Sequence, residues 1–254
     1  MSYKAIMLDV DGTLVPYDKN ALPSQKVQQV ISKAREHITV CVATGRSFAF
    51  VEPVLKSLSI NHGIAIVNNG AQVVDITTKK LYYNQPMLET DVTLIIELLR
   101  NEGIPFFLNE GFNDFLFEEG YEPTNVYNIF THEKFSRRQI DQILHHLHHS
   151  PTISIQETTH KDRDKFGLLI THAQATKQHG ILEAAKILDI NPREIVGVGD
   201  GYNDFPLFMA CGLKVAMGNA NEDLKQIADY IAPTVEDDGV AHVIEKYILL
   251  SHEV

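Results

Sequence analysis

The stretch "AIMLDVDGTLV" (residues 5–15) closes an apolar run with two carboxylates, Asp9 and Asp11, and then a glycine. Side chains two positions apart in a strand point to the same face. Two carboxylates on one face repel each other unless a cation, a proton or water lies between them. The pattern therefore predicts a short buried strand whose carboxyl end uses concentrated negative charge.

The composition is that of an ordinary globular protein. The chain has 254 residues, of which 44% are hydrophobic, and its 22 basic against 33 acidic residues give a formal charge of -11. An acidic chain without a basic run argues against nucleic-acid binding. No apolar run approaches the roughly 20 residues of a membrane helix, and no signal-peptide pattern opens the chain. We expect a cytoplasmic protein without membrane partners; oligomeric state has no signature here.

The cysteines and a cluster of histidines are explained by structure without a functional site. Cys41 and Cys211 lie in apolar contexts without metal-ligand spacing, so we expect buried, reduced thiols. In "SRRQIDQILHHLHHS", helical spacing puts His145, His146 and His149 opposite the apolar face. An exposed histidine face is favoured there over a metal site.

Strand and helix patterns alternate at both ends of the chain. Residues 3–10, 38–45 and 63–74 are predicted strands, and residues 22–37 have the periodicity of a helix. The last eighty residues show the same alternation of strand and helix patterns. Such alternation predicts an α/β fold with a doubly wound, parallel, Rossmann-like sheet, in which reactive groups gather at the carboxyl ends of the strands.

The middle of the chain has a different pattern. Two helices flank short apolar runs, and strands follow over "TISIQETT" and "DKFGLLITH". We interpret residues 82–175 as an α+β domain, large enough for its own core, inserted between the two parts of the catalytic core, residues 1–81 and 176–254.

Four short elements carry the candidate chemistry: "DVDGT", "ATGR", the lysine of "TKQHG", and "GDGYND". Together they suit a phosphate ester. A carboxylate can attack phosphorus, and Mg²⁺, held by one or two carboxylates, offsets the repulsion between two anions. Asp9 and Asp200 can supply those carboxylates, while Lys177 and the Thr44 hydroxyl can hold phosphoryl oxygens. Asp11 can protonate the leaving oxygen and then activate water.

Each element alone has a simpler explanation. D-x-D-G-T can be a strand followed by a carboxylate-rich turn, and a single lysine is usually a surface charge. "GDGYND" can be a tight turn, but it lacks the spacing and terminal Glu of an EF-hand calcium loop. The four elements in this order favour phosphoryl chemistry.

These motifs, with "NNGA", "VAMGNANEDLK" and "DDGVAHVIEKY", resemble those of the haloacid dehalogenase superfamily of phosphohydrolases, in particular its Cof-type branch, over almost the whole chain. The resemblance implies an aspartyl-phosphate mechanism with a cap domain at residues 82–175. It implies Asp9 as nucleophile and Asp11 as acid/base, with Asp204 supporting the metal through its water shell. The Mg²⁺ ligands would be Asp9, the Asp11 backbone carbonyl and Asp200. The phosphate would be held by the Val10 backbone, Thr44, Gly45, Lys177 and Asn203. The third motif departs from the family pattern around its lysine, as Thr176-Lys177-Gln178.

We therefore expect a Mg²⁺-dependent phosphatase of small phosphorylated metabolites, with sugar phosphates favoured. The segment "FFLNEGFNDF" (residues 106–115) is a candidate contributor to substrate choice. One alternative is a phosphomannomutase-like phosphotransferase, although those proteins have "GGND" at the fourth motif. Another is a non-catalytic phosphometabolite-binding protein, which has no need to keep both Asp9 and Asp11. A dinucleotide-binding protein is disfavoured because no G-x-G-x-x-G follows a strand.

Overall fold

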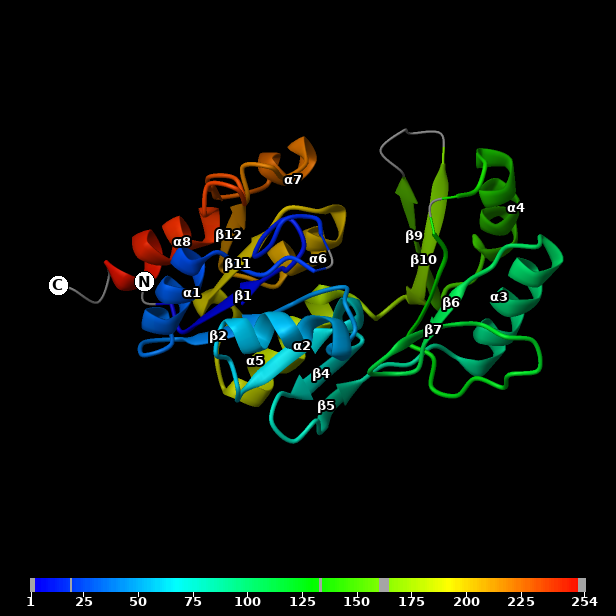
Figure 1. The fold of residues 1–254 in the computed structure, drawn as a ribbon, viewed down its shortest axis with the longest axis horizontal. Coiled ribbons are helices and arrows are strands. Elements are labelled where there is room, and N and C mark those ends of the chain that lie inside the picture. Colours follow the sequence, from blue (N-terminus) through cyan, green and yellow to red (C-terminus); the bar gives the residue numbers. More distant parts are fainter. Residues whose placement is uncertain (1–2, 19, 133, 160–164, 251–254) are drawn as a thin grey trace. The chain divides into compact units, whose positions relative to one another are not determined.

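The computed structural model describes residues 3–18, 20–132, 134–159 and 165–250. The chain divides into two compact units, residues 1–84 with 176–254 and residues 85–175 (Figure 1). Strand β5 (Leu81–Asn84) pairs with β4 (Gln72–Asp75), which is why residues 82–84 lie in the first unit rather than in the second. Among the described helices, none has both the length and the apolar composition needed to cross a membrane.

The predicted parallel sheet is present in the first unit. Its strand order is β13-β12-β11-β1-β2, and every neighbouring pair is parallel. Strands from the two ends of the sequence lie side by side in it (Figure 1). Their carboxyl ends therefore meet at one edge. The strands are β1 (Ala5–Leu8), β2 (Thr39–Val42), β11 (Ile195–Gly199), β12 (Leu213–Ala216) and β13 (Tyr230–Ile231).

Both faces of this sheet are covered. Ala5 and Met7 belong to a buried cluster with side chains of two helices, α5 (Lys177–Leu188) and α6 (Phe205–Met209). Ile6 and Leu8, which alternation points to the other face, are also fully buried. The helices of this unit are α1 (Gln25–Ala34), α2 (Phe48–Ser57), α5 (Lys177–Leu188), α6 (Phe205–Met209), α7 (Glu222–Gln226) and α8 (Gly239–Ile244). Shorter turns are η1 (Asn68–Gly70), η2 (Pro192–Glu194), η3 (Tyr202–Asp204) and the π-helical η4 (Glu245–Leu249).

The single strand predicted over residues 63–74 is wrong. Two antiparallel strands, β3 (Ile64–Val67) and β4, form a hairpin there. Asn68, Asn69 and Gly70 between them have φ of 51°, 58° and 93°. Three successive left-handed residues reverse the chain, so the apolar run folds back on itself. A parallel bridge between Ala43 and Ile66 keeps β3 beside β2.

The second unit is an antiparallel sheet with two helices. The sheet order is β7-β6-β8-β10-β9, and both helices share a buried apolar cluster with it. Three of the strands, β6, β7 and β8, have three residues each, too short for a periodic signal. The elements are α3 (Glu89–Asn101), β6 (Phe107–Asn109), β7 (Asp114–Leu116), β8 (Asn128–Phe130), α4 (Arg137–Leu147), β9 (Ile153–Thr159) and β10 (Phe166–His172).

The histidine and cysteine predictions are confirmed. His145, His146 and His149 are exposed, on or just after α4, whose buried side chains include Ile140 and Ile143. Cys41 and Cys211 are buried free thiols.

Candidate active site

Two of the predicted carboxylates lie side by side because their strands are neighbours. Asp9 follows β1, and its amide donates to the carbonyl of Val198 in β11 at 3.0 Å. Asp200 follows β11 directly. Carboxylate oxygens of Asp9, Asp200 and Asp204 all lie within 4.8 Å of one another, and all three residues are buried. The edge of the sheet thus concentrates negative charge, as the opening motif predicts.

A buried lysine balances part of this charge. Lys177 is the first residue of α5, after the N-cap residue Thr176, and its side chain is fully buried. Its ammonium lies 2.5 Å from Oδ1 of Asp9 and 2.6 Å from Oδ1 of Asp204. Burial by itself lowers the pKa of Lys177, but the charges of Asp204 and Asp9 outweigh it and hold the pKa above its ordinary value. Lys177 is therefore a fixed cation.

Asp204 orders the loop around it. Its Oδ2 accepts hydrogen bonds from the amides of Asp200 and Gly201, both at 2.9 Å. Its Oδ1 is taken by Lys177. With both oxygens engaged, Asp204 fixes the Asp200 backbone and the lysine. That arrangement agrees better with a supporting role than with direct metal ligation.

Asp200 has donors that the sequence motifs did not indicate. Thr13 donates to Oδ1 at 3.0 Å and Tyr17 to Oδ2 at 2.5 Å, with Asn219 at 3.5 Å from Oδ2. Burial, reinforced by the charge of Asp204, still raises the pKa of Asp200 to about 6. Thr13 belongs to the motif "DVDGT" and Asn219 to "VAMGNANEDLK", but nothing in the sequence singles out Tyr17.

The charges at this edge favour a divalent cation. Burial, followed by the negative charge of Asp204, raises the pKa of Asp9 well above its ordinary value, although the positive charge of Lys177 acts to lower it. Three buried carboxylates face one ammonium, and within the described residues Oδ2 of Asp9 accepts no hydrogen bond. Ligands of one octahedral Mg²⁺ lie at most about 4 Å apart, close to the spacing seen here. The residues present fit a hard cation held by oxygen.

Asp11 has a different environment from Asp9. The guanidinium of Arg46 binds both of its oxygens, at 2.9 and 2.6 Å. The Asp11 side chain is 34% exposed, against 6% for Asp9. The two carboxylates of the opening motif thus have different partners: Asp9 pairs with the buried ammonium of Lys177, and the more exposed Asp11 pairs with the guanidinium of Arg46, whose side chain is 10% exposed.

The remaining predicted residues form a second group beside the carboxylates. The amide of Ala43 donates to the carbonyl of Leu8, which brings Thr44 next to Asp9, and the Arg46 amide donates to Thr44 Oγ1 at 3.1 Å. Asn69 joins this group: its amide donates to the Thr44 carbonyl at 3.0 Å, and Asn203 donates to its Oδ1 at 3.3 Å.

Two residues hold the backbone of this edge in place. A Cβ on Gly45 would lie 3.4 Å from Asn69 Oδ1, so Gly45 keeps the strand end close to Asn69. The Val10 carbonyl accepts the amides of residues 13, 14 and 15, which folds the first motif into a tight turn.

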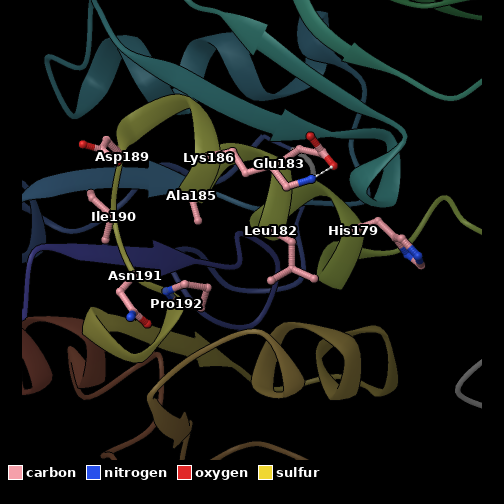
Figure 2. Close-up of a pocket in the computed structure, with 9 residues that line it drawn as sticks. All are labelled: His179, Leu182, Glu183, Ala185, Lys186, Asp189, Ile190, Asn191 and Pro192. Atoms are coloured by element: carbon pink, nitrogen blue, oxygen red, sulfur yellow. Dashed lines mark hydrogen bonds and ion pairs between the residues drawn. The ribbon is translucent and has the colours of Figure 1, made fainter.

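Two grooves elsewhere carry none of the predicted site residues. One, of about 630 Å³, runs along α5 and is lined by residues that include His179, Leu182 and Ile190 (Figure 2). Two of its charged side chains, Glu183 and Lys186, pair with each other at 2.7 Å. The other, of about 430 Å³, lies between α3 and residues 121–126 in the second unit. The predicted site residues therefore lie at the sheet edge and not in either of these two grooves.

The chain is similar to known hydrolases and phosphatases over almost its whole length. The haloacid dehalogenase-like hydrolase family model matches residues 6–244. The 5-amino-6-(5-phospho-D-ribitylamino)uracil phosphatase of Bacillus subtilis is 28% identical over 97% of this chain and 96% of its own. A phosphoglycolate phosphatase of Methanopyrus kandleri is 25% identical over 96% of both chains. A solved haloacid dehalogenase-like hydrolase of B. subtilis has a TM-score of 0.82 at 24% identity, covering 96% of this chain and 99% of its own.

Proposed function

Because the chain belongs to the haloacid dehalogenase-like hydrolase family, we propose that it is a Mg²⁺-dependent phosphatase of small phosphorylated metabolites with Asp9 as its nucleophile. The observation that carries this assignment is the environment of Asp9. Its carboxylate lies buried at the strand end, with one oxygen on the Lys177 ammonium and the other free of hydrogen bonds from any described residue.

The proposed reaction has two steps. In the first, a carboxylate oxygen of Asp9 attacks phosphorus, the bond from phosphorus to the ester oxygen breaks, and protonated Asp11 gives its proton to the leaving oxygen. In the second, the Asp11 carboxylate takes a proton from water, whose oxygen attacks the phosphorus of the acyl phosphate and releases Asp9. One water is consumed, and the alcohol and inorganic phosphate are formed.

Asp9, Asp200 and the backbone carbonyl of Asp11 would hold the Mg²⁺. When bound, the cation offsets the repulsion between the carboxylate and the anionic ester. Lys177, fixed by Asp9 and Asp204, adds a second positive charge. We propose that the phosphoryl oxygens are bound by Lys177, by the Val10 amide and by the neighbouring group of Thr44, Gly45 and Asn203.

The substrate class follows from the relatives, which are named for different small phosphate esters. We propose that residues 82–175 act as a cap that selects among such esters, sugar phosphates included. In the segment of residues 106–115, Phe106 is in the apolar core, whereas Asn109 donates to Asp114 at 2.5 Å. The two buried free thiols support a reducing, cytoplasmic setting.

The test is hydrolysis of p-nitrophenyl phosphate and a panel of phosphorylated metabolites with Mg²⁺ present. Asp9→Asn should lose at least about a thousandfold in rate while keeping its fold, because an amide cannot form the acyl phosphate. The matched control is Asp18→Asn, which changes an exposed carboxylate of the same loop and should keep full activity.

Three outcomes would contradict the proposal. Turnover retained in Asp9→Asn refutes the nucleophile, and full activity in excess chelator refutes the metal. Tight binding of phosphorylated metabolites without turnover would favour the non-catalytic binding protein instead. Transfer of the phosphoryl group to a second sugar, in place of water, would favour the phosphotransferase.

A further inference from the structure

The hydroxyl of Tyr17 binds the Asp200 carboxylate oxygen that lies beside Gly12 of the first motif. It donates to Oδ2 of Asp200 at 2.5 Å across 183 positions of sequence. A Cβ on Gly12 would lie 2.2 Å from that same Oδ2 and 2.6 Å from the Tyr17 ring. Oδ2 is therefore the oxygen of Asp200 nearer to Gly12, which directly follows Asp11, whose backbone carbonyl is a proposed metal ligand.

The two strong donors to Asp200 differ in how easily they can leave. Thr13, on Oδ1, is 2% exposed and lies inside the turn that the Val10 carbonyl closes. Tyr17, on Oδ2, is 73% exposed. A ring with little buried surface can rotate away at small cost in packing, whereas the buried side chain of Thr13 is packed on all sides.

We propose that Tyr17 is a positioning residue that occupies Oδ2 of Asp200 in the metal-free site and gives up this oxygen to the divalent cation. A buried carboxylate oxygen without a close donor is costly, and Tyr17 supplies the close donor to Oδ2, where Asn219 lies at 3.5 Å, until the cation arrives. The cation then competes with the phenol for the same oxygen, so Tyr17 weakens metal binding. This inference rests on the proposed metal dependence of the enzyme.

The experiment is direct measurement of Mg²⁺ binding by calorimetry on chelator-treated protein. Tyr17→Phe keeps the ring and removes only the competing hydroxyl, so its Kd should fall about 3- to 10-fold, the range expected for one net hydrogen bond. The control is Tyr202→Phe, an exposed tyrosine of the fourth motif whose hydroxyl contacts Asp223 rather than Asp200. Its Kd should equal that of the wild type.

A second readout follows the phenol itself. The chain contains no tryptophan, so tyrosine dominates its near-ultraviolet absorbance. Mg²⁺ should produce a tyrosine difference spectrum in the wild type and in Tyr202→Phe, but not in Tyr17→Phe. Wild-type binding with an unchanged or higher Kd in Tyr17→Phe overturns the role of Tyr17 alone. Absence of Mg²⁺ binding in the wild type overturns the metal-dependent function as well.

Discussion

The ammonium of Lys177 lies 2.5 Å from Oδ1 of Asp9, although 168 positions separate the two residues. Both side chains are almost fully buried, and the same ammonium binds Asp204. Burying an ion pair costs desolvation free energy. The attraction between the two charges offsets this cost only where their geometry is good and further hydrogen bonds are present. The contact therefore ties the helix α5 to the strand end where the chemistry is proposed.

Removal of this ammonium should destabilise the protein strongly. Lys177→Met leaves Asp9, Asp200 and Asp204 clustered without their cation, and we expect a loss of about 3–5 kcal/mol in unfolding free energy at pH 7. Lys186→Met on the same helix removes a 70% exposed side chain and should cost under about 1 kcal/mol. Urea denaturation of the metal-free proteins measures both. Equal, small losses in the two variants would show that the buried pair contributes little.

The stability of the metal-free protein should depend on Asp200. Its pKa is raised from 3.8 to about 6 in the folded state, so the folded protein binds the proton more tightly than the unfolded chain does. The stabilising contribution is therefore complete below pH 3.8 and is lost as pH rises through about 6. Relative to Asp200→Asn, the wild type should lose about 2–3 kcal/mol between pH 4 and 7. A difference that stays constant with pH would contradict the raised pKa.

Gly12 should be intolerant of a side chain. Its φ is +79°, and a Cβ would meet both Asp200 and Tyr17. Gly63 has a φ of +98° but nothing within 4 Å, so Gly63→Ala isolates the cost of the backbone conformation, about 1 kcal/mol. Gly12→Ala should cost clearly more in thermal unfolding and should also weaken Mg²⁺ binding. Equal losses of stability in Gly12→Ala and Gly63→Ala would mean that the structure relieves the crowding around Gly12 at no cost in free energy.

The sequence was informative where a motif directly follows a strand. An apolar run ending in Asp9, and another ending in Asp200, predict their own place at the sheet edge because parallel strands share one direction. The hairpin of residues 64–75 was missed because apolar residues on both sides of Asn68–Gly70 look like one strand.

Contacts made by side chains far apart in sequence have no periodic signal. The Tyr17–Asp200 hydrogen bond spans 183 positions, and the Arg46–Asp11 pair depends on how two loops meet. Arg46 stood in the "ATGR" motif, so its presence at the site was predictable, but its partner was not.

The Arg46–Asp11 pair makes a prediction about leaving groups. Arg46 holds both oxygens of the proposed acid/base, so Arg46→Gln should leave Asp11 poorly oriented to protonate the leaving oxygen. An alkyl phosphate needs that proton, and its single-turnover rate should fall about 10- to 100-fold. A p-nitrophenyl ester leaves readily as the anion and should be slowed much less. Arg35→Gln, which removes an exposed guanidinium bound to the Ser59 carbonyl, serves as the control. Equal losses for both esters would instead assign Arg46 to phosphate binding.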